Sequence, residues 1–398
     1  MRLNILVVNV GSSTIKYQLF DMDTESVVCK GLLDKVGIRG STLEHKHPGK
    51  ETIRIDRDID DHKTGMDLIL KVLLGDGTEK VHIDAVGHRV VHGGESFSSS
   101  VIIDDSVIRV IEDCSTLAPL HNPPNLMGIR SCTELLPSIP HVAVFDTAFH
   151  QSMKPENYLY ALPREAYEKY KVRRYGFHGT SHEFVSKAAA DLLGKPYDEL
   201  RIITLHLGSG ASMAAIRNGL VVDTSMGFTP LEGLVMGTRT GDMDPAIVCY
   251  LMEKLGLSPG EMDSYLNKKS GLLGLSGVSA DLRYVIEAAD SGNIDSKEAL
   301  EVYCLRIKGY IGNYMAKLNG CDCLVFTAGV GENSSLVRER VLENLDALGI
   351  GLDREKNKAG CMNCDISLPG TPVRIYVVPT NEELMIARQT LSVLASNP

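Results

Sequence analysis

The fold is decided by residues 5–21, ILVVNVGSSTIKYQLFD, where an apolar run enters a glycine–serine turn and a second run follows. The second run, residues 14–20, alternates apolar and polar side chains, which predicts a returning strand and not a helix. A glycine followed by two hydroxyl groups lets backbone amides and side chains hold phosphate oxygens. The P-loop pattern G-x-x-x-x-G-K-[ST] is absent here. The stretch therefore predicts a phosphate-binding hairpin and not a P-loop.

The same arrangement returns at residues 202–216, IITLHLGSGASMAAI. Aligning Asn9 with His206 places Gly11 on Gly208 and Ser12 on Ser209. Such self-similarity at half the chain length predicts two related domains, each opening with a phosphate hairpin. A third glycine turn, FTAGVGENS at residues 326–334, precedes a helical pattern over residues 336–348 with Asn333 or Ser334 suited to its N-cap. Three glycine turns in this order predict one nucleotide site between two lobes.

Periodicity supplies the remaining elements. Further strands are predicted at residues 27–33, 51–55, 85–91 and 374–378, and helices at residues 60–74, from near Asn125, and at residues 384–394. The polar stretch 37–50, with its Pro-Gly pair, is expected to be an exposed loop.

Composition limits the function classes. The chain of 398 residues is longer than one hydrophobic core usually serves, which favours two domains. A net charge of −10 without a dense block of Lys and Arg argues against nucleic acid as the main partner. The sequence has no apolar run of about 18 residues that would span a bilayer and no signal-peptide pattern, so no membrane partner and a cytoplasmic location are expected.

The nine cysteines are odd in number and scattered along the chain, which predicts reduced thiols and not a disulfide framework. Cys321-x-Cys323 and Cys361-x-x-Cys364 together suggest a four-thiolate zinc site. We favour the alternative that Cys321 and Cys323 are ordinary core residues, because they flank the entry to an apolar strand.

Eight segments in collinear order, from about residue 4 to residue 390, resemble the successive signatures of the acetokinase family. They are NVGSSTIKYQLFD, GHRVVHGGE, VFDTAFHQSM, RRYGFHGTSH, HLGSGASMAAIRNG, DTSMGFTPLEGLVMGTRTGDMDP, TAGVGENS and PTNEELMIARQT. The resemblance implies an α/β protein of two duplicated actin-like (ribonuclease H-like) domains with a nucleotide cleft between them. Residues 1–150, completed by the helix 382–398, would form the first domain, and residues 151–381 the nucleotide-binding second domain.

The resemblance also implies an activity, reversible transfer of phosphate from ATP to acetate to give ADP and acetyl phosphate, by direct in-line transfer. The implied cofactor is Mg²⁺, with Mn²⁺ as a substitute, and the implied assembly is a homodimer. Acetate is already ionised at neutral pH, so the site needs cations and hydrogen-bond donors and not a strong base.

Arg89 and Arg239 are the candidate cations, since a guanidinium fork binds carboxylate or phosphate through two bonds. An arginine beside a glycine-rich loop is more often a structural ion pair, but the resemblance assigns both to catalysis. It makes His178 the donor to the transferring phosphoryl group and Asp146 the group that orients an arginine or a metal-bound water. A core histidine and a loop-capping aspartate are the plainer interpretations of the same residues, and for His182 we favour a structural role over a metal pair.

Binding residues follow from the same resemblance. Asn9 and Glu382 are expected at the magnesium site, acting through waters. Lys16 is either a phosphate contact or a solvated strand residue. The expected nucleotide contacts are Ser12, Lys16, His206, Leu207, Gly208, Ser209, Gly210, Asp281, Leu282, Arg283, Gly329, Val330, Gly331, Glu332 and Asn333. The expected pocket for the acetate methyl group is Val91, Leu120, Phe177 and Pro230.

Two residues depart from the family pattern, Thr14 in place of a serine and Ser209 in place of an asparagine. The nearest competing function is a propionate kinase of the same fold, and Val91, larger than alanine, favours acetate. A pyrophosphate-dependent relative is disfavoured by the intact GVGEN motif. A non-catalytic nucleotide-binding module of the actin or Hsp70 type would have no use for Arg89, Arg239 and the acetate pocket.

Overall fold

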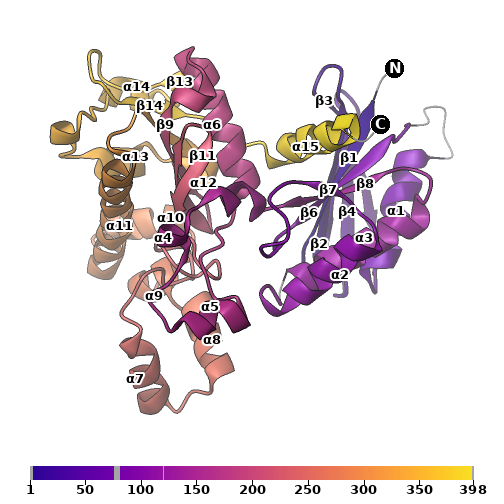
Figure 1. The fold of residues 1–398 in the computed structure, drawn as a ribbon, viewed down its shortest axis with the longest axis horizontal. Helices are drawn as coiled ribbons and strands as arrows, with labels where there is room; N and C mark the ends of the chain where they lie inside the picture. The colour runs from indigo at the N-terminus through magenta and orange to yellow at the C-terminus, as the bar shows by residue number, and fades with distance from the viewer. Residues whose placement is uncertain (1–2, 76–80, 120, 397–398) are drawn as a thin grey trace. The chain divides into compact units, whose positions relative to one another are not determined.

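A computed structural model of the chain describes residues 3–75, 81–119 and 121–396. The contacts divide the chain into two units (Figure 1). The first unit comprises Met1–Gln151 and Asn381–Pro398, and the second comprises Ser152–Thr380. Each unit is built on its own mixed β-sheet with helices packed against it, so the predicted α/β class is confirmed.

The first unit has an eight-stranded sheet in the order β5-β4-β3-β2-β1-β6-β8-β7. Its strands are β1 Asn4–Val10, β2 Thr14–Asp21, β3 Ser26–Asp34, β4 Thr42–Lys46, β5 Ile53–Asp56, β6 Ala85–Val90, β7 Val101–Ile102 and β8 His141–Phe145. Strands β1 to β5 pair antiparallel in sequence order, whereas β1, β6 and β8 run parallel. The main helices are α1 His62–Leu74, α2 Asp105–Asp113, α3 Asn122–Leu135 and α15 Glu382–Ser396.

The second unit has a six-stranded sheet in the order β11-β10-β9-β12-β14-β13. Its strands are β9 Arg201–Leu207, β10 Ala211–Arg217, β11 Leu220–Thr224, β12 Cys323–Thr327, β13 Cys364–Asp365 and β14 Arg374–Val377. Strands β9, β12 and β14 run parallel. Its helices are α4 Pro155–Tyr158, α5 Arg164–Tyr170, α6 Gly179–Leu193, α7 Ala246–Leu255, α8 Pro259–Lys268, α9 Gly271–Ser276, α10 Leu282–Asp290, α11 Ile294–Leu318, α12 Ala328–Asn333, α13 Ser335–Leu342 and α14 Arg354–Lys358.

The predicted repeat is present as two hairpins whose connecting turns have the same length. Strands β1 and β2 are joined by residues 11–13, and strands β9 and β10 by residues 208–210. In each turn a backbone amide closes the loop, Gly11 N on the Thr14 carbonyl at 2.8 Å and Gly208 N on the Gly210 carbonyl at 3.1 Å.

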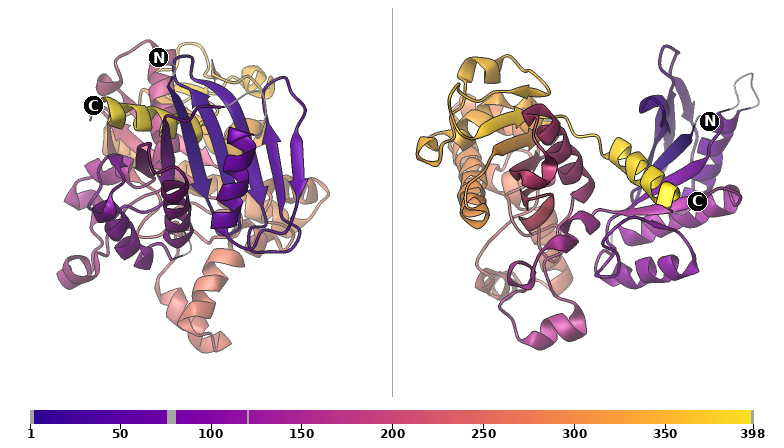
Figure 2. Two further views of the ribbon diagram at one scale, coloured as in Figure 1. Left: turned by 90° about the vertical axis from the view of Figure 1, so that its right-hand side faces the viewer. Right: turned by 45° about the horizontal axis from the view of Figure 1, so that its top comes forward.

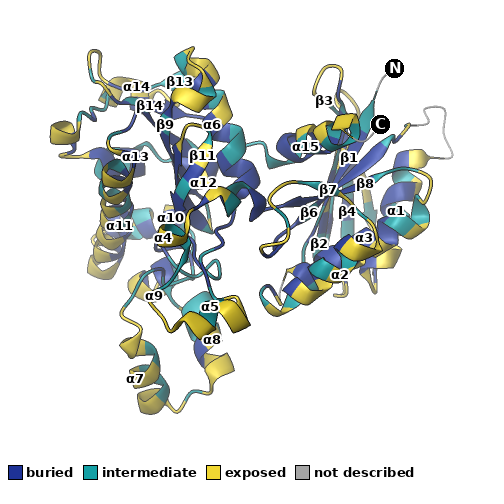
Figure 3. Ribbon diagram, in the orientation of Figure 1, coloured by how far each residue is buried: buried dark blue, intermediate teal, exposed yellow. Residues whose placement is uncertain are grey.

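Helix α15 comes from the far end of the chain and packs on β1, β6 and β8 of the first sheet (Figure 2). Gly87 of β6 permits this close approach, because a Cβ there would lie 2.4 Å from Thr390 Oγ1 and 2.9 Å from Ile386 Cγ2. The helix therefore completes the layer over the parallel strands, and the buried strand residues of both sheets form the cores (Figure 3).

Four expectations are corrected. The polar stretch 37–50 contains strand β4, where Leu43 and His45 alternate inward with polar neighbours. The glycine turn after β12 is itself the short helix α12, and the helix after it ends at Leu342. Cys361 and Cys364 form a disulfide with Cα atoms 5.9 Å apart, because the two-residue spacing brings both thiols to one turn.

The four-thiolate zinc site is not formed either. Cys321 Sγ donates instead to the Cys323 carbonyl at 2.9 Å, and burial raises the pKa of Cys321 to about 12. Within the described residues, no helix has the length and apolar character needed to cross a membrane.

Candidate active site

In the first unit, the predicted site residues lie at the carboxyl ends of three parallel strands. The register places Val8 of β1 beside His88 of β6, and Val90 of β6 beside Phe145 of β8. Asn9, Arg89 and Asp146 therefore meet at one edge of the sheet, the edge where α/β sheets commonly bind ligands.

Arg89 and Asp146 form a two-bonded ion pair. The Arg89 Nε donates to Asp146 Oδ1 at 3.1 Å and Nη2 donates to Oδ2 at 2.7 Å. The Asp146 side chain is 1% exposed, whereas Arg89 keeps 22% of its side chain open. Although burial opposes it, the carboxylates of Asp146, Glu382 and Glu383 raise the pKa of Arg89, so this guanidinium is permanently charged and firmly oriented.

Asn9 and Lys16 face each other across the first hairpin. They are paired in the β1–β2 register, and Asn9 Oδ1 accepts a bond from Arg89 Nη1 at 3.3 Å. Lys16 is exposed, and its ammonium has no ion pair among the residues that the structure describes. Glu382 is the first residue of α15. Ser12, at the tip of the turn, is also exposed.

Two side chains that sequence reasoning missed stabilise the backbone around these residues of the first unit. Asn125 of α3 donates from Nδ2 to the Val10 carbonyl at 2.8 Å and accepts from the Val91 amide at 3.1 Å. His62 Nε2 is 2.9 Å from the Gly11 carbonyl. Asn125 thus ties the end of the phosphate hairpin to the strand end that carries the predicted acetate-pocket residue Val91, which is buried. Leu120 of the same predicted pocket lies outside the described residues.

In the second unit, the predicted site residues gather around the hairpin between β9 and β10. A Cβ on Gly210 would lie 3.4 Å from Arg239 Nη1 and 3.7 Å from His178 Nε2, so both side chains stand beside this turn. Arg239 donates only to the Pro230 carbonyl at 3.2 Å and to Met236 Sδ at 3.8 Å. Among the described residues no carboxylate pairs with it, and burial lowers its pKa. An unneutralised, half-buried guanidinium is suited to receive an anion.

His178 stands at the start of α6 with a left-handed backbone, φ 57°. This conformation is uncommon outside glycine and costs free energy at a position that the surrounding structure must fix. Its ring stacks on the His206 ring, with centroids 4.2 Å apart. Phe177 beside it is buried.

A buried chain of hydrogen bonds runs behind His178. His178 Nδ1 is 2.9 Å from Ser212 Oγ, Ser212 Oγ is 2.8 Å from His182 Nε2, and His182 Nδ1 is 2.7 Å from Thr204 Oγ1. The predicted structural role of His182 agrees with this position. We call His178, Ser212, His182 and Thr204 the histidine relay.

The direction of the relay is set at Thr204. Its hydroxyl lies 2.7 Å from His182 Nδ1 but 3.5 Å from the Ala214 carbonyl, which is a marginal hydrogen bond. The shorter contact favours donation from this hydroxyl to His182. His182 would then donate from Nε2 to Ser212, and Ser212 would donate to His178 Nδ1. In this direction a neutral His178 carries its proton on Nε2, the nitrogen nearest Gly210.

A cavity of about 630 Å³ adjoins the same hairpin, within the range of small-molecule sites. Of the predicted nucleotide contacts it is lined by Gly208, Ser209, Asp281, Leu282, Arg283, Gly329, Val330 and Asn333. It also has lining residues that the sequence did not single out, namely Gly237, Leu272, Ala280, Ile286, Tyr303 and Ser334. The Tyr303 hydroxyl is buried without a hydrogen-bond partner among the described residues.

Other predicted nucleotide contacts lie elsewhere. Glu332 Oε1 accepts the Ala328 amide at 2.7 Å and the Thr380 amide at 3.1 Å, so its carboxylate braces the backbone and does not line the cavity. The Gly331 carbonyl accepts from Arg338. His206 is held by Ser181, with Oγ 2.8 Å from its Nδ1. Glu332, Gly331, His206 and Leu207 are thus not among the residues that line the cavity.

The Gly208–Gly210 hairpin adjoins a cavity large enough for a nucleotide, and Arg239 beside it has no described carboxylate partner. These features indicate a kinase, that is, a phosphotransferase. Comparison with known proteins makes the class specific. The model of the acetokinase family matches residues 4–388. The chain belongs to the acetokinase family, whose phosphoryl acceptor is a carboxyl group.

Individual relatives agree over nearly the full length. The chain is 62% identical over 394 residues to the acetate kinase of Syntrophomonas wolfei, covering 98% of this chain and 99% of the relative. It is 56% identical over 399 residues to that of Thermotoga maritima, with coverage of 98% and 99%.

Among solved structures, Porphyromonas gingivalis acetate kinase superposes with a TM-score of 0.94 at 47% identity, covering 98% of this chain and all of that one. A propionate kinase from Francisella tularensis superposes with a TM-score of 0.91 at 40% identity, with coverage of 97% and 98%. The propionate kinase is thus a weaker match than the Porphyromonas gingivalis acetate kinase.

Proposed function

We propose that this chain transfers the terminal phosphoryl group of ATP to acetate, reversibly and in line, giving ADP and acetyl phosphate. The observation that supports it most is Arg239, a half-buried guanidinium without a described carboxylate partner beside His178 and the Gly208–Gly210 turn. A structural arginine commonly has such a partner, as Arg201 has in Asp322.

The roles divide by charge. Arg239 neutralises anionic oxygens on the second unit, and His178 donates from Nε2 to the transferring phosphoryl group. Arg89, fixed by Asp146, offers its exposed side to a carboxylate or a phosphate. No residue needs to act as a strong base, because acetate arrives ionised. The Tyr303 hydroxyl and the cavity of 630 Å³ serve the nucleoside.

The residues of the first unit suit a magnesium ion. Asp146 uses both carboxylate oxygens on Arg89 at up to 3.1 Å, whereas the Asn9 amide oxygen accepts one longer bond from Arg89 at 3.3 Å. We assign the Asn9 amide oxygen and the Glu382 carboxylate as the donors for a cation. Two protein oxygens are a sparse set, and Mg²⁺ usually keeps several waters and takes one or two carboxylates, with Mn²⁺ as a substitute. Bound to phosphate oxygens, the ion would neutralise developing charge.

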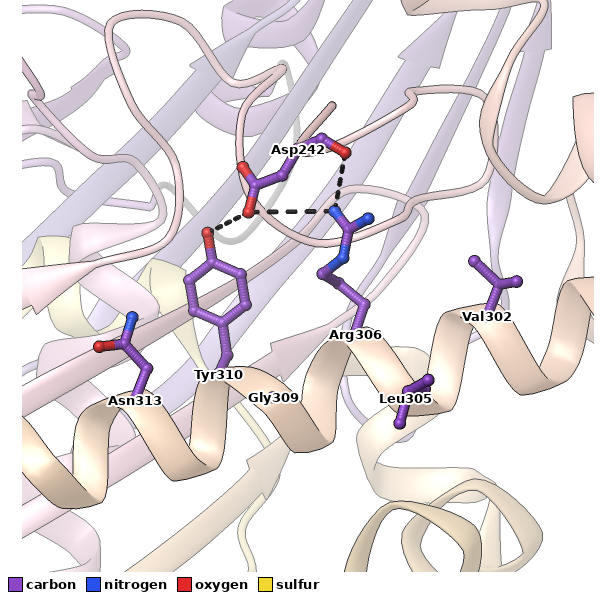
Figure 4. A pocket seen from close by; sticks show the side chains of 7 residues that line it. All are labelled: Asp242, Val302, Leu305, Arg306, Gly309, Tyr310 and Asn313. Carbon is purple, nitrogen blue, oxygen red and sulfur yellow. Dashed lines mark hydrogen bonds and ion pairs between the residues drawn. The ribbon is translucent and has the colours of Figure 1, made fainter. Parts of the chain in front are cut away.

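We further propose a homodimer in the cytoplasm. Helix α7 has no buried residue although it is rich in apolar side chains (Figure 3), among them Ile247, Tyr250 and Leu255. On α11, Val302 and Leu305 are exposed on the helix that also carries Arg306 and Tyr310 (Figure 4). Tyr310 donates to Asp242 Oδ2 at 2.7 Å, which ties this helix to the segment that carries Asp242. Sedimentation of Tyr250→Glu and Leu305→Glu, with the exposed Leu220→Glu as control, tests the assembly.

The activity test traps acyl phosphate with hydroxylamine, using acetate, propionate or butyrate with Mg²⁺ and either ATP or pyrophosphate. Acetate- and ATP-dependent product is expected, with propionate weaker, because one methylene changes binding in an apolar pocket by about 1–3 kcal/mol. Arg239→Ala is expected to lower kcat by about 100- to 1,000-fold. Arg201→Ala, which removes an arginine already paired with Asp322, is the matched control. Absence of acyl phosphate from every acid would refute the proposal.

A further inference from the structure

We propose that the first unit binds a thiophilic transition-metal cation, with Cys29, His45 and His47 as its ligands and Zn²⁺ as the ion of choice. One coordinating atom from each residue lies within 4.8 Å of the others, the one such group found among the described residues. The site shares no residue with the proposed active site, and it stands independently of the proposed function.

Strand register brings the three side chains to one face of the sheet. Gly31 of β3 pairs with His45 of β4. Cys29 precedes Gly31 by two residues and His47 follows His45 by two, so antiparallel pairing sets Cys29 opposite His47. Side chains two residues apart on a strand share a face. Cys29 and His45 are therefore placed by two paired strands, and His47 is the first residue after β4.

Both imidazole rings are oriented by partners on their Nδ1 atoms. His45 Nδ1 lies 2.6 Å from the Tyr17 hydroxyl, and His47 Nδ1 lies 3.2 Å from the Val28 carbonyl. Histidines that bind metals usually engage the other ring nitrogen in this way, which fixes the ring and its tautomer. The rings cross at 76° with centroids 4.7 Å apart, and each leaves Nε2 for coordination.

The Nε2 of His45 supplies the independent observation. His45 is 1% exposed, and its Nε2 is buried with no hydrogen-bond partner among the described residues. Buried polar atoms are nearly always paired, so an unpaired one calls for a missing partner. A plain core histidine, satisfied by Tyr17 alone, does not account for this second nitrogen.

Gly31 keeps the arrangement open. A Cβ on Gly31 would lie 2.4 Å from the Tyr17 ring and 2.6 Å from the Glu44 carbonyl. Any side chain there would push Tyr17 off His45, so the glycine preserves the hydrogen bond that orients the ligand.

The chemistry of the three donors selects the ion. One thiol and two imidazoles suit Zn²⁺, whereas Mg²⁺ and Ca²⁺ prefer oxygen ligands. Binding forms the sulfur–metal bond and releases the thiol proton to solvent. The half-buried His47 gives access for the ion and for a water in the fourth position.

Cobalt(II) is the probe, because it reports a thiolate ligand by charge-transfer absorption. The full chain, with Cys361→Ser and Cys364→Ser to remove the competing pair, is stripped with chelator and titrated with Co²⁺. The expected result is a thiolate–cobalt band that saturates at one ion per chain and is abolished by one equivalent of Zn²⁺ but not by excess Mg²⁺. Proton release, measured in two buffers, should accompany binding.

Matched variants decide the assignment. Cys29→Ser and His47→Ala should lose the band, and Tyr17→Phe should weaken binding about 10- to 100-fold. Cys132→Ser removes another fully buried cysteine of the same core and should leave the band unchanged. His47→Ala alters a half-buried residue at the end of β4, so it preserves the test if Cys29→Ser fails to fold. Absence of the band in the parent, or its persistence in His47→Ala, would overturn the proposal.

Discussion

Ser212→Ala tests the histidine relay directly. The Ser212 hydroxyl bonds His178 Nδ1 and His182 Nε2; Ser212 and His182 are buried, and His178 is half-buried. The substitution leaves two ring nitrogens without their partner, and a buried unsatisfied group costs about 1–3 kcal/mol. Unfolding in urea should therefore show a loss of about 2 kcal/mol or more.

Activity should fall for a separate reason. His178 loses the bond that orients its ring, which weakens its own bond from Nε2 to the charged phosphoryl group. A hydrogen bond to a charged group contributes about 1.5–3 kcal/mol. That corresponds to about a 10- to 150-fold lower kcat, with the KM values for ATP and acetate little changed, because the bond acts in the transition state.

Ser186→Ala is the matched control. Ser186 is fully buried on the same helix α6 and bonds the Tyr197 hydroxyl at 2.9 Å, outside the relay. It should lose stability while keeping kcat. Nitrogen NMR of the parent should find the His178 proton on Nε2. A proton on Nδ1, or equal kcat values for Ser212→Ala and Ser186→Ala, would refute the direction and the role of the relay.

Three further predictions concern other parts of the molecule. Asp146→Asn should cost about 3–5 kcal/mol of unfolding free energy in urea, because it removes the counter-charge of Arg89; a loss below 1 kcal/mol would contradict the buried pairing. Tyr303→Phe should raise the KM for ATP about two- to tenfold without lowering stability, since its hydroxyl has no described partner to lose and one bond contributes about 0.5–1.5 kcal/mol; an unchanged KM would place the nucleoside elsewhere. In the metal-free folded protein, burial lowers the pKa of His45 to about 4, whereas in the unfolded chain the pKa is near its ordinary value of 6.5. Between these two pH values the unfolded chain binds a proton on His45 that the folded protein does not. Stability should therefore fall by about 3 kcal/mol as the pH drops through that window, and His45→Asn, followed by the same urea titration, should flatten the curve.

The sequence predicts what is local or repeated. The two hairpins were visible because their strands alternate around glycine and serine, and α1 and α15 because their apolar residues follow helical spacing. Strand β4 was missed because its inward positions are Leu43 and His45, and a histidine reads as polar in a charged stretch. The glycines at 329 and 331 suggested a turn, but packing of α12 on β9 and β12 decided for a helix.

The support of the site could not be read from residue types. Ser212 and Thr204 are ordinary small residues on neighbouring strands, and only the β9–β10 register brings them to His182. Asn125 is likewise one polar residue on a helix until the fold sets it against Val10. Glu332 was assigned to nucleotide because it lies inside the glycine motif, although its side chain turns back to the Ala328 and Thr380 amides.

Helix α15 has a consequence for synthesis on the ribosome. The first unit is interrupted after Gln151 and resumes only at Asn381, so about 230 residues are translated before the covering helix appears. At 5–20 residues per second this takes about 10–50 s, during which the β1–β6–β8 face and the small gap at Gly87 have no native cover. The second unit, continuous in sequence, is expected to fold before the first unit is complete. Moving α15 to precede β1 by circular permutation would remove that interval.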